Sequence, residues 1–112
     1  MTPPQLTEAE ALELLAQHYG LTGQLVALPG ERDRNFQFCL ASGEKNTFKV
    51  VSAKVPLESL KTEIRAMQHL NSELGSLVPN PLADQAGSFI SQGSLQNGSA
   101  CWLRLQSWQP GI

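Results

Sequence analysis

The stretch TFKVVSAKVPLESLKTEIRAMQHL, residues 47–70, joins a strand pattern directly to a helix pattern. Residues 47–51 are β-branched or aromatic apart from Lys49, and a short run of that kind predicts a strand. From Leu57 to Leu74, large apolar residues recur at steps of three and four, which predicts an amphipathic helix. A proline precedes the first of these leucines and a glycine follows the last, as is typical of helix ends. The stretch therefore predicts a strand followed by the longest helix of the chain.

The rest of the sequence predicts an α+β fold around this unit. Thr7 followed by Glu10 is a capping-box pattern, which predicts a short first helix that ends near Gly20. The Pro/Gly-rich segment 78–87 is expected to be a loop. The remaining strand patterns are residues 24–28, residues 36–40, and two strands within residues 88–108 around an Asn97-Gly98 turn. We therefore expect a single domain, residues 1–112, with a five-stranded antiparallel sheet and a long helix between strands 3 and 4.

The composition is that of a globular protein without an overall attraction for polyanions. Of the 112 residues, 41% are hydrophobic and 16% are charged, and the formal net charge of -2 gives no basic field for nucleic acid or anionic lipid. No apolar run reaches the roughly 18 residues of a membrane-spanning helix, and the N-terminus lacks a secretory signal. Cys39 and Cys101 are expected to be buried, reduced thiols, with a disulfide as the alternative. We expect a cytoplasmic protein with no nucleic-acid partner, no membrane partner and no metal site.

Two charged residues stand among apolar neighbours. Strand pleating places Lys49 on one face with Thr47 and Val51, whereas Phe48 points to the other face. On a helical wheel, Glu63 falls inside the apolar stripe of the long helix. A carboxylate on a buried face is costly unless it is paired, so Lys49 and Glu63 are candidate partners. The alternative is that Glu63 lies at the edge of the stripe and that both charges simply face solvent.

A charged loop lies between the first two strand patterns. Its sequence, PGERDRN at residues 29–35, holds two acids and two arginines, so its formal charge is zero and it is not a simple trap for anions. Asp33 and Asn35 are residue types that fix turns through hydrogen bonds from the side chain to the backbone.

The chain resembles the N-terminal lobe of the aminoglycoside phosphotransferase and choline kinase-like superfamily in the order of five segments, GERDRNFQF, TFKVV, EIRAMQHL, VPNPLADQAG and WLRLQSWQPG. The R-D-x-N-F loop and the E-x-x-x-M-x-H-L helix are most similar to hydroxylysine kinase-like phosphotransferases. They are also similar to kinase-like lobes fused to class III, pyridoxal-phosphate-dependent aminotransferases. The resemblance covers essentially the whole chain, and the order and spacing of its short motifs carry it.

The resemblance implies a protein kinase-like N-terminal lobe that binds ATP or GTP with Mg²⁺. In this lobe a loop covers the nucleotide, Lys49 contacts its phosphates, Glu63 orients Lys49, and the chain near Trp108 is a hinge whose backbone faces adenine. The nucleotide-binding residues that it implies are Gly30, Glu31, Arg32, Asp33, Arg34, Asn35, Lys49, Glu63, Gln106, Ser107 and Trp108. The loop has only Gly30 where protein kinases have G-x-G-x-x-G, so it departs from the glycine-rich pattern whose backbone contacts the phosphates.

The catalytic groups that the resemblance implies lie outside this sequence. The family's catalytic loop, H-x-D-x-x-x-x-N, and its metal-binding aspartate belong to a C-terminal lobe, and neither His18 nor His69 begins such a segment. Phosphoryl transfer needs a positioning carboxylate and metal ligands. We therefore expect residues 1–112 to be a lobe excised from a longer protein and inactive by itself.

Three functions remain open at this point. The first is the nucleotide-binding lobe of a small-molecule kinase that phosphorylates a hydroxyl of an amine or amino-alcohol, bound mostly by the missing lobe. The second is the kinase-like lobe of a fusion with a class III aminotransferase. The third is a non-catalytic α+β interaction module, in which Lys49 and Glu63 are surface charges.

Overall fold

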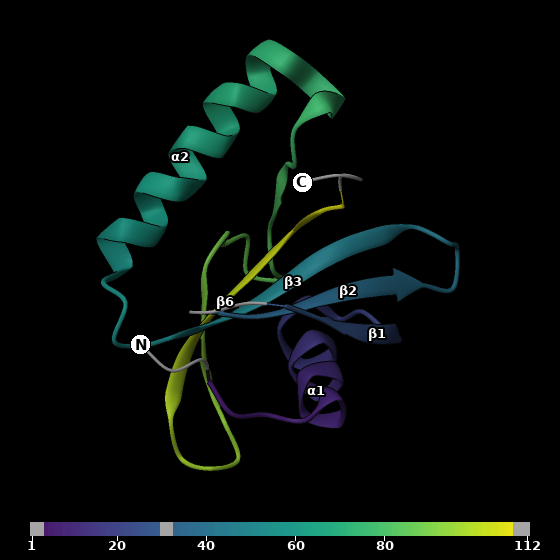
Figure 1. The fold of residues 1–112 in the computed structure, drawn as a ribbon, viewed down its shortest axis with the longest axis vertical. Helices are drawn as coiled ribbons and strands as arrows, with labels where there is room; N and C mark the ends of the chain where they lie inside the picture. The colour runs from purple at the N-terminus through teal and green to yellow at the C-terminus, as the bar shows by residue number, and fades with distance from the viewer. Residues whose placement is uncertain (1–3, 30–32, 109–112) are drawn as a thin grey trace.

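The computed structural model describes residues 4–29 and 33–108. Its elements are α1 (Glu8–Tyr19), β1 (Gly23–Leu28), β2 (Arg34–Leu40), β3 (Lys45–Ser52), α2 (Leu57–Leu74), the short 3-10 helix η1 (Gly75–Leu77), β4 (Pro81–Leu82), β5 (Ser91–Ser94) and β6 (Ala100–Ser107). The fold is α+β, as predicted, and its long helix follows the third strand (Figure 1). Within the described ranges, no helix has the length and apolar character needed to cross a membrane.

The strands form one antiparallel sheet in the order β1-β2-β3-β6-β4, and β5 also pairs with β6. The described part of the chain thus has six strands where five were predicted. The additional strand is β4, in which Pro81 lies opposite Gln106 and Leu82 lies opposite Leu105. Two residues are too few to show a periodicity, so only their pairing with β6 reveals this strand.

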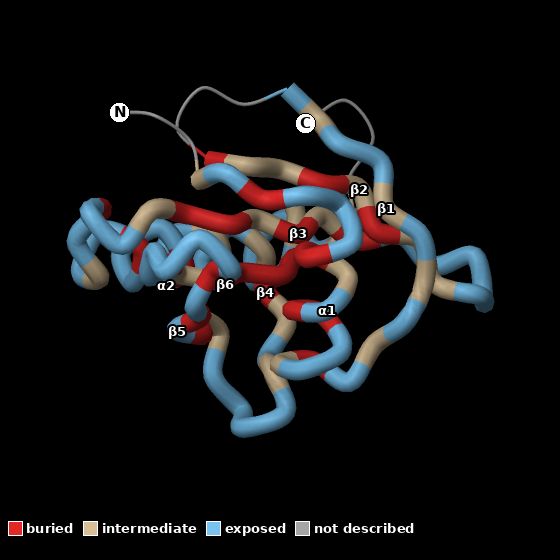
Figure 2. The backbone as a smooth tube through the Cα atoms, turned by 90° about the horizontal axis from the view of Figure 1, so that it is seen from below, coloured by how far each residue is buried: buried red, intermediate tan, exposed pale blue. Residues whose placement is uncertain are grey.

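The main core lies between α1 and one face of the sheet. Thr7 accepts a hydrogen bond from the Glu10 N–H (3.1 Å), and Gly20, at a φ of 67°, ends the helix, so the predicted caps are confirmed. The largest fully buried side chains of this core are Leu15, Phe36, Phe38, Phe48, Val50 and Leu103. Figure 2 shows that buried residues concentrate along the strands.

A smaller core lies on the other face of the sheet, beneath the first half of α2. It consists of Val51, Val55 and Leu60, with Trp102 packed against them. The indole N–H of Trp102 donates to the Val55 carbonyl (3.0 Å), which ties β6 to the segment that leads into α2. The helix extends beyond the sheet (Figure 1), so the predicted apolar stripe is buried only in its first half.

The two cysteines are free thiols in different surroundings. Cys101 is fully buried in the core beneath α1, and burial raises the pKa of its thiol to about 11. Cys39 is only half-buried, so the prediction of two buried thiols is wrong for this residue. It alternates with Phe36 and Phe38 along β2, which places it on the opposite face of the sheet from the aromatic core.

Candidate functional site

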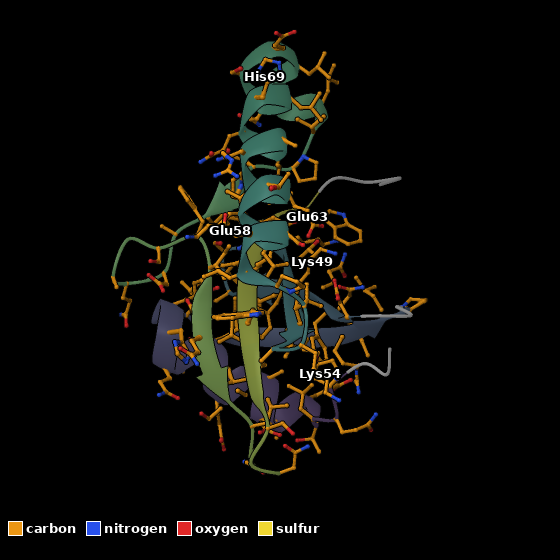
Figure 3. All side chains as sticks on the ribbon, turned by 90° about the vertical axis from the view of Figure 1, so that its left-hand side faces the viewer. Lys49, Lys54, Glu58, Glu63 and His69 are labelled. Carbon is orange, nitrogen blue, oxygen red and sulfur yellow. The ribbon has the colours of Figure 1, made fainter. Side chains whose placement is uncertain are left out.

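Strand β3 and helix α2 bring Lys49 and Glu63 to the wall of one cavity. We call it the helix cavity; its volume is about 480 Å³, and it is lined by Lys49, Glu63, Ala66, Met67, Leu70, Val78, Pro79, Arg104 and Gln106. Figure 3 shows Glu63 on the side of α2 that faces Lys49, whereas Glu58 lies on the other side. The helix cavity therefore joins two residues that were predicted to act together.

Lys49 belongs to a row of polar side chains that crosses three strands. In the register of the sheet, Asn35 of β2 and Arg104 of β6 are its neighbours on either side. The Lys49 ammonium donates to Asn35 Oδ1 (3.2 Å), and Asn35 Nδ2 donates to the Pro29 carbonyl (3.4 Å). Asn35 thus connects the Lys49 ammonium to the chain just beyond β1, as expected for a residue that fixes a turn.

Arg104 is a buried cation that was not among the predicted site residues. Its side chain is 4% exposed, and its Nη1 lies 3.6 Å from Glu63 Oε1, on a side chain that is 44% exposed. A guanidinium buried to this degree needs a carboxylate nearby, so the contact explains an acidic residue on this side of α2. That Glu63 orients Lys49 stays a prediction, whereas its contact with Arg104 is a feature of the structure.

The signal that identifies Arg104 is the alternation of β6. In the segment CWLRLQSW, residues 101–108, Cys101, Leu103 and Leu105 pack in the core beneath α1. The intervening Trp102, Arg104 and Gln106 must then face the side of the sheet that carries Lys49. The alternation is visible in the sequence, but the register that pairs Arg104 with Lys49 is not.

A second cavity, the loop cavity, has a volume of about 470 Å³ and is lined by Leu28, Pro29, Asn35, Thr47, Lys49, Gln106 and Trp108. Lys49 and Gln106 line the helix cavity as well, so the two cavities adjoin at these side chains. Leu28, Pro29 and Trp108 give the loop cavity apolar walls, and Lys49 adds a cation to them. A ligand with a flat apolar part and an anionic part matches this distribution.

The predicted nucleotide-covering loop reaches these cavities only in part. Gly30, Glu31 and Arg32 lie outside the described residues, and Asp33 is buried. Arg34 alternates with Asn35 along β2, and its guanidinium lies 5.3 Å above the Phe36 ring, on the α1 side of the sheet. The structure thus brings Asn35 to Lys49 but leaves Arg34 on the opposite face.

The predicted hinge residues lie at the end of β6. The side chain of Gln106 lines both cavities, and Trp108 lines the loop cavity. The Ser107 N–H donates to the Asn80 carbonyl (3.0 Å), and the Trp108 N–H donates to the Lys45 carbonyl (3.2 Å). These two backbone donors are therefore engaged within the protein, and we expect side chains of this segment to contribute to ligand recognition.

The structure is an antiparallel sheet with a long helix after its third strand and Lys49 within that strand, an arrangement that resembles a kinase N-terminal lobe. Among solved structures, amicoumacin kinase hAmiN in complex with AMP-PNP, Ca2+ and Ami has this fold, with a TM-score of 0.77 and 20% sequence identity over 95% of this chain. This chain covers 32% of that kinase, about a third of its length. No family profile and no curated protein matches the sequence. The likeness confirms the predicted fold, while the hydroxylysine kinase branch and the aminotransferase fusion stay predictions.

Proposed function

We propose that this chain is the nucleotide-binding lobe of a small-molecule kinase that transfers the γ-phosphate of ATP or GTP to a hydroxyl of an amine or amino-alcohol. One observation carries the proposal: the Lys49 ammonium, held by Asn35 Oδ1, lies where the helix cavity and the loop cavity adjoin. An ammonium in that position suits phosphate oxygens, which are strong acceptors of charge-assisted hydrogen bonds. The likeness to a kinase solved with AMP-PNP supports the same proposal.

The loop cavity suits a nucleotide in size and in the chemical character of its walls. Its volume of about 470 Å³ falls in the range of roughly 300–1,000 Å³ that is usual for small-molecule sites. The base would lie against Trp108, and the phosphates would extend toward Lys49. Asn35 would hold the Lys49 ammonium beside the nucleotide from the β2 side.

The chain's own residues would bind and orient the nucleotide. In the transfer, the bond between the γ-phosphorus and the β–γ bridging oxygen breaks, the acceptor oxygen bonds to that phosphorus, and the hydroxyl proton passes to a base. Lys49 would offset charge on the phosphates, while Glu63 and Arg104 hold α2 against β6. We place the base and the Mg²⁺ ligands outside residues 1–112; in the described ranges, no group of three or more His, Cys, Asp and Glu side chains is arranged to hold a metal ion.

We place the acceptor mostly on the second lobe, outside residues 1–112, because the loop cavity suits the nucleotide itself. We place the kinase in the cytoplasm, since its two cysteines are free thiols and reduced thiols persist in that compartment.

A titration of the ¹⁵N-labelled chain with Mg-ATP and Mg-GTP tests the proposal. We expect saturable amide shifts at Asn35, at Lys49 and over residues 106–108. The Lys49→Ala variant should bind about 10-fold or more weakly, because a charge-assisted contact is lost. Lys45→Ala is the matched control: it removes an exposed lysine from the start of the same strand and should leave binding unchanged.

The opposite results are equally clear. Shifts confined to α1 and its core, equal effects of the two lysine variants, or no saturable shift at millimolar nucleotide would contradict the proposal. The last outcome would favour the non-catalytic interaction module.

A further inference from the structure

Gln106 stands in the wall between the two cavities. Strand β6 places it opposite Thr47 of β3, on the face of the sheet that carries Lys49. Its side chain lines both the helix cavity and the loop cavity, although the residue is only 9% exposed. A molecule that fills the loop cavity therefore contacts the Gln106 side chain.

The side-chain oxygen of Gln106 has no partner within the part of the chain that the structure describes, and it is shielded from solvent. Buried polar atoms in folded proteins nearly always have a hydrogen-bond partner, because an unpaired one has lost its bonds to water without replacement. A leucine or methionine at this position would avoid that cost. The amide oxygen is thus available for a ligand in the loop cavity that the side chain lines.

The rest of the loop cavity indicates which part of a ligand lies nearest. Lys49 is the register partner of Arg104, and Trp108 lies four residues further along the chain, so a flat ring packed on Trp108 would direct its phosphates toward Lys49. Gln106 then lies beside the edge of that ring. A carboxamide carries both an acceptor and a donor, and a half-turn of the amide exchanges their positions.

Building on the proposed nucleotide site, we propose that the Gln106 amide binds the substituent at position 6 of the purine and admits both adenine and guanine nucleotides. Its oxygen accepts a hydrogen bond from the exocyclic amine of adenine. After a half-turn, its NH₂ group donates to the carbonyl oxygen of guanine. A single side chain thereby matches two bases of opposite hydrogen-bonding character.

The test compares three triphosphates that differ at this position of the base. ATP carries an amine there, GTP carries a carbonyl oxygen, and purine riboside triphosphate carries only hydrogen. Dissociation constants are measured by calorimetry or amide-shift titration for the unmodified chain and for Gln106→Leu, with Gln106→Met as a second apolar variant of similar length. Gln92→Leu is the control, since Gln92 of β5 is exposed and lines neither cavity.

We expect the unmodified chain and Gln92→Leu to bind ATP and GTP within about 10-fold of each other, and each about 10-fold more tightly than purine riboside triphosphate. In Gln106→Leu the three affinities should converge to within ~3-fold, because the discrimination depends on the amide.

Two results overturn the inference while the nucleotide site stands. One is an equal weakening of all three ligands in Gln106→Leu, as a purely structural residue would cause. The other is a preference of the unmodified chain for one base by more than about 100-fold. If the unmodified chain binds none of the three, the proposed nucleotide site fails and the inference fails with it.

Discussion

The Arg104 guanidinium is almost completely buried, and the Glu63 carboxylate reaches it from a position near solvent. Such a pair is asymmetric. Removal of the Glu63 carboxylate takes away one of the negative charges that offset the cost of burying the Arg104 guanidinium. Replacement of Arg104 by an apolar side chain instead removes that cost together with the ion pair. The exposed partner weakens the attraction through solvent screening. Glu63 is therefore expected to contribute modestly to stability, through Arg104.

This asymmetry gives a prediction for the free energy of unfolding. Glu63→Gln should lower it by about 1 kcal/mol, while Arg104→Met should be nearly neutral. Glu58→Gln is the control on the same helix, because Glu58 contacts Lys61 at 3.5 Å in an exposed pair and should change stability by less than about 0.5 kcal/mol. Urea denaturation of the three variants measures these differences. A larger loss for Glu58→Gln than for Glu63→Gln would contradict the assignment.

Individual residues of the candidate site were predictable to different degrees. Lys49 was identified because a lysine inside a short apolar strand is conspicuous, and Glu63 because it interrupts an apolar stripe. Arg104 was missed because a basic residue that alternates with core residues also fits a solvent-facing strand position. Only the pairing of β3 with β6 places it beside Lys49, and Lys49 and Arg104 are 55 positions apart in the sequence.

At the scale of elements, local signals predicted those features that local interactions create. The cap of α1 depends on residues three positions apart, and the β5–β6 hairpin depends on one turn. The strand β4 and the extent of burial of α2 depend on distant partners. Leu70 and Leu74 continue the apolar spacing of α2, but each is 48% exposed because the helix extends past the sheet. The spacing of apolar residues reveals that α2 has an apolar stripe, but it does not reveal how far the sheet extends along the helix to bury that stripe.

The α1 cap provides a prediction at this scale. Thr7→Ala removes the oxygen that accepts the Glu10 N–H, so the free energy of unfolding should fall by about 1 kcal/mol. Thr62→Ala is the matched control within α2, because the Thr62 hydroxyl donates to the Glu58 carbonyl of the preceding turn. This bond adds little to a helix, and alanine has the higher helix propensity, so stability should change by less than about 0.5 kcal/mol. Equal losses in thermal or urea unfolding would contradict the capping role.

The α1 contacts extend beyond this cap. The Glu10 carboxylate accepts a hydrogen bond from the Gln96 N–H, which joins the helix to the β5–β6 turn. A single acidic side chain thus connects the first helix to the last hairpin, and α1 holds together parts of the chain that are distant in sequence.

For the whole molecule, two buried groups that are uncharged when protonated, the Tyr19 hydroxyl and the Cys101 thiol, determine how the free energy of unfolding changes at alkaline pH. Burial raises the pKa of the Tyr19 hydroxyl from 10.0 to about 12, and burial raises the pKa of the Cys101 thiol from 9.0 to about 11. In each case the folded state favours the protonated form. The contribution of each group to the free energy of unfolding is fully present below its unfolded-state pKa. It is lost as the pH rises through its folded-state pKa.

The prediction is a fall in the free energy of unfolding between pH 9 and pH 12. Tyr19 should account for on the order of 2 kcal/mol of this fall, and Tyr19→Phe should remove that part. Because Tyr19 is the single tyrosine of the chain, tyrosinate absorbance follows its ionisation directly. Ionisation near pH 10 in the folded state, as in urea, would contradict the prediction.

The chain has two tryptophans, and the fold places them in positions that report different events. The Trp102 indole N–H is hydrogen-bonded to the Val55 carbonyl beneath α2, whereas Trp108 lines the loop cavity. Fluorescence of the unlabelled protein therefore contains two separable signals. Emission from Trp108, isolated in a Trp102→Phe variant, senses a molecule that enters the loop cavity, and emission from Trp102, isolated in Trp108→Phe, senses detachment of the helix. Ligand entry and helix movement are thus observable as distinct optical signals in a chain that needs no dye.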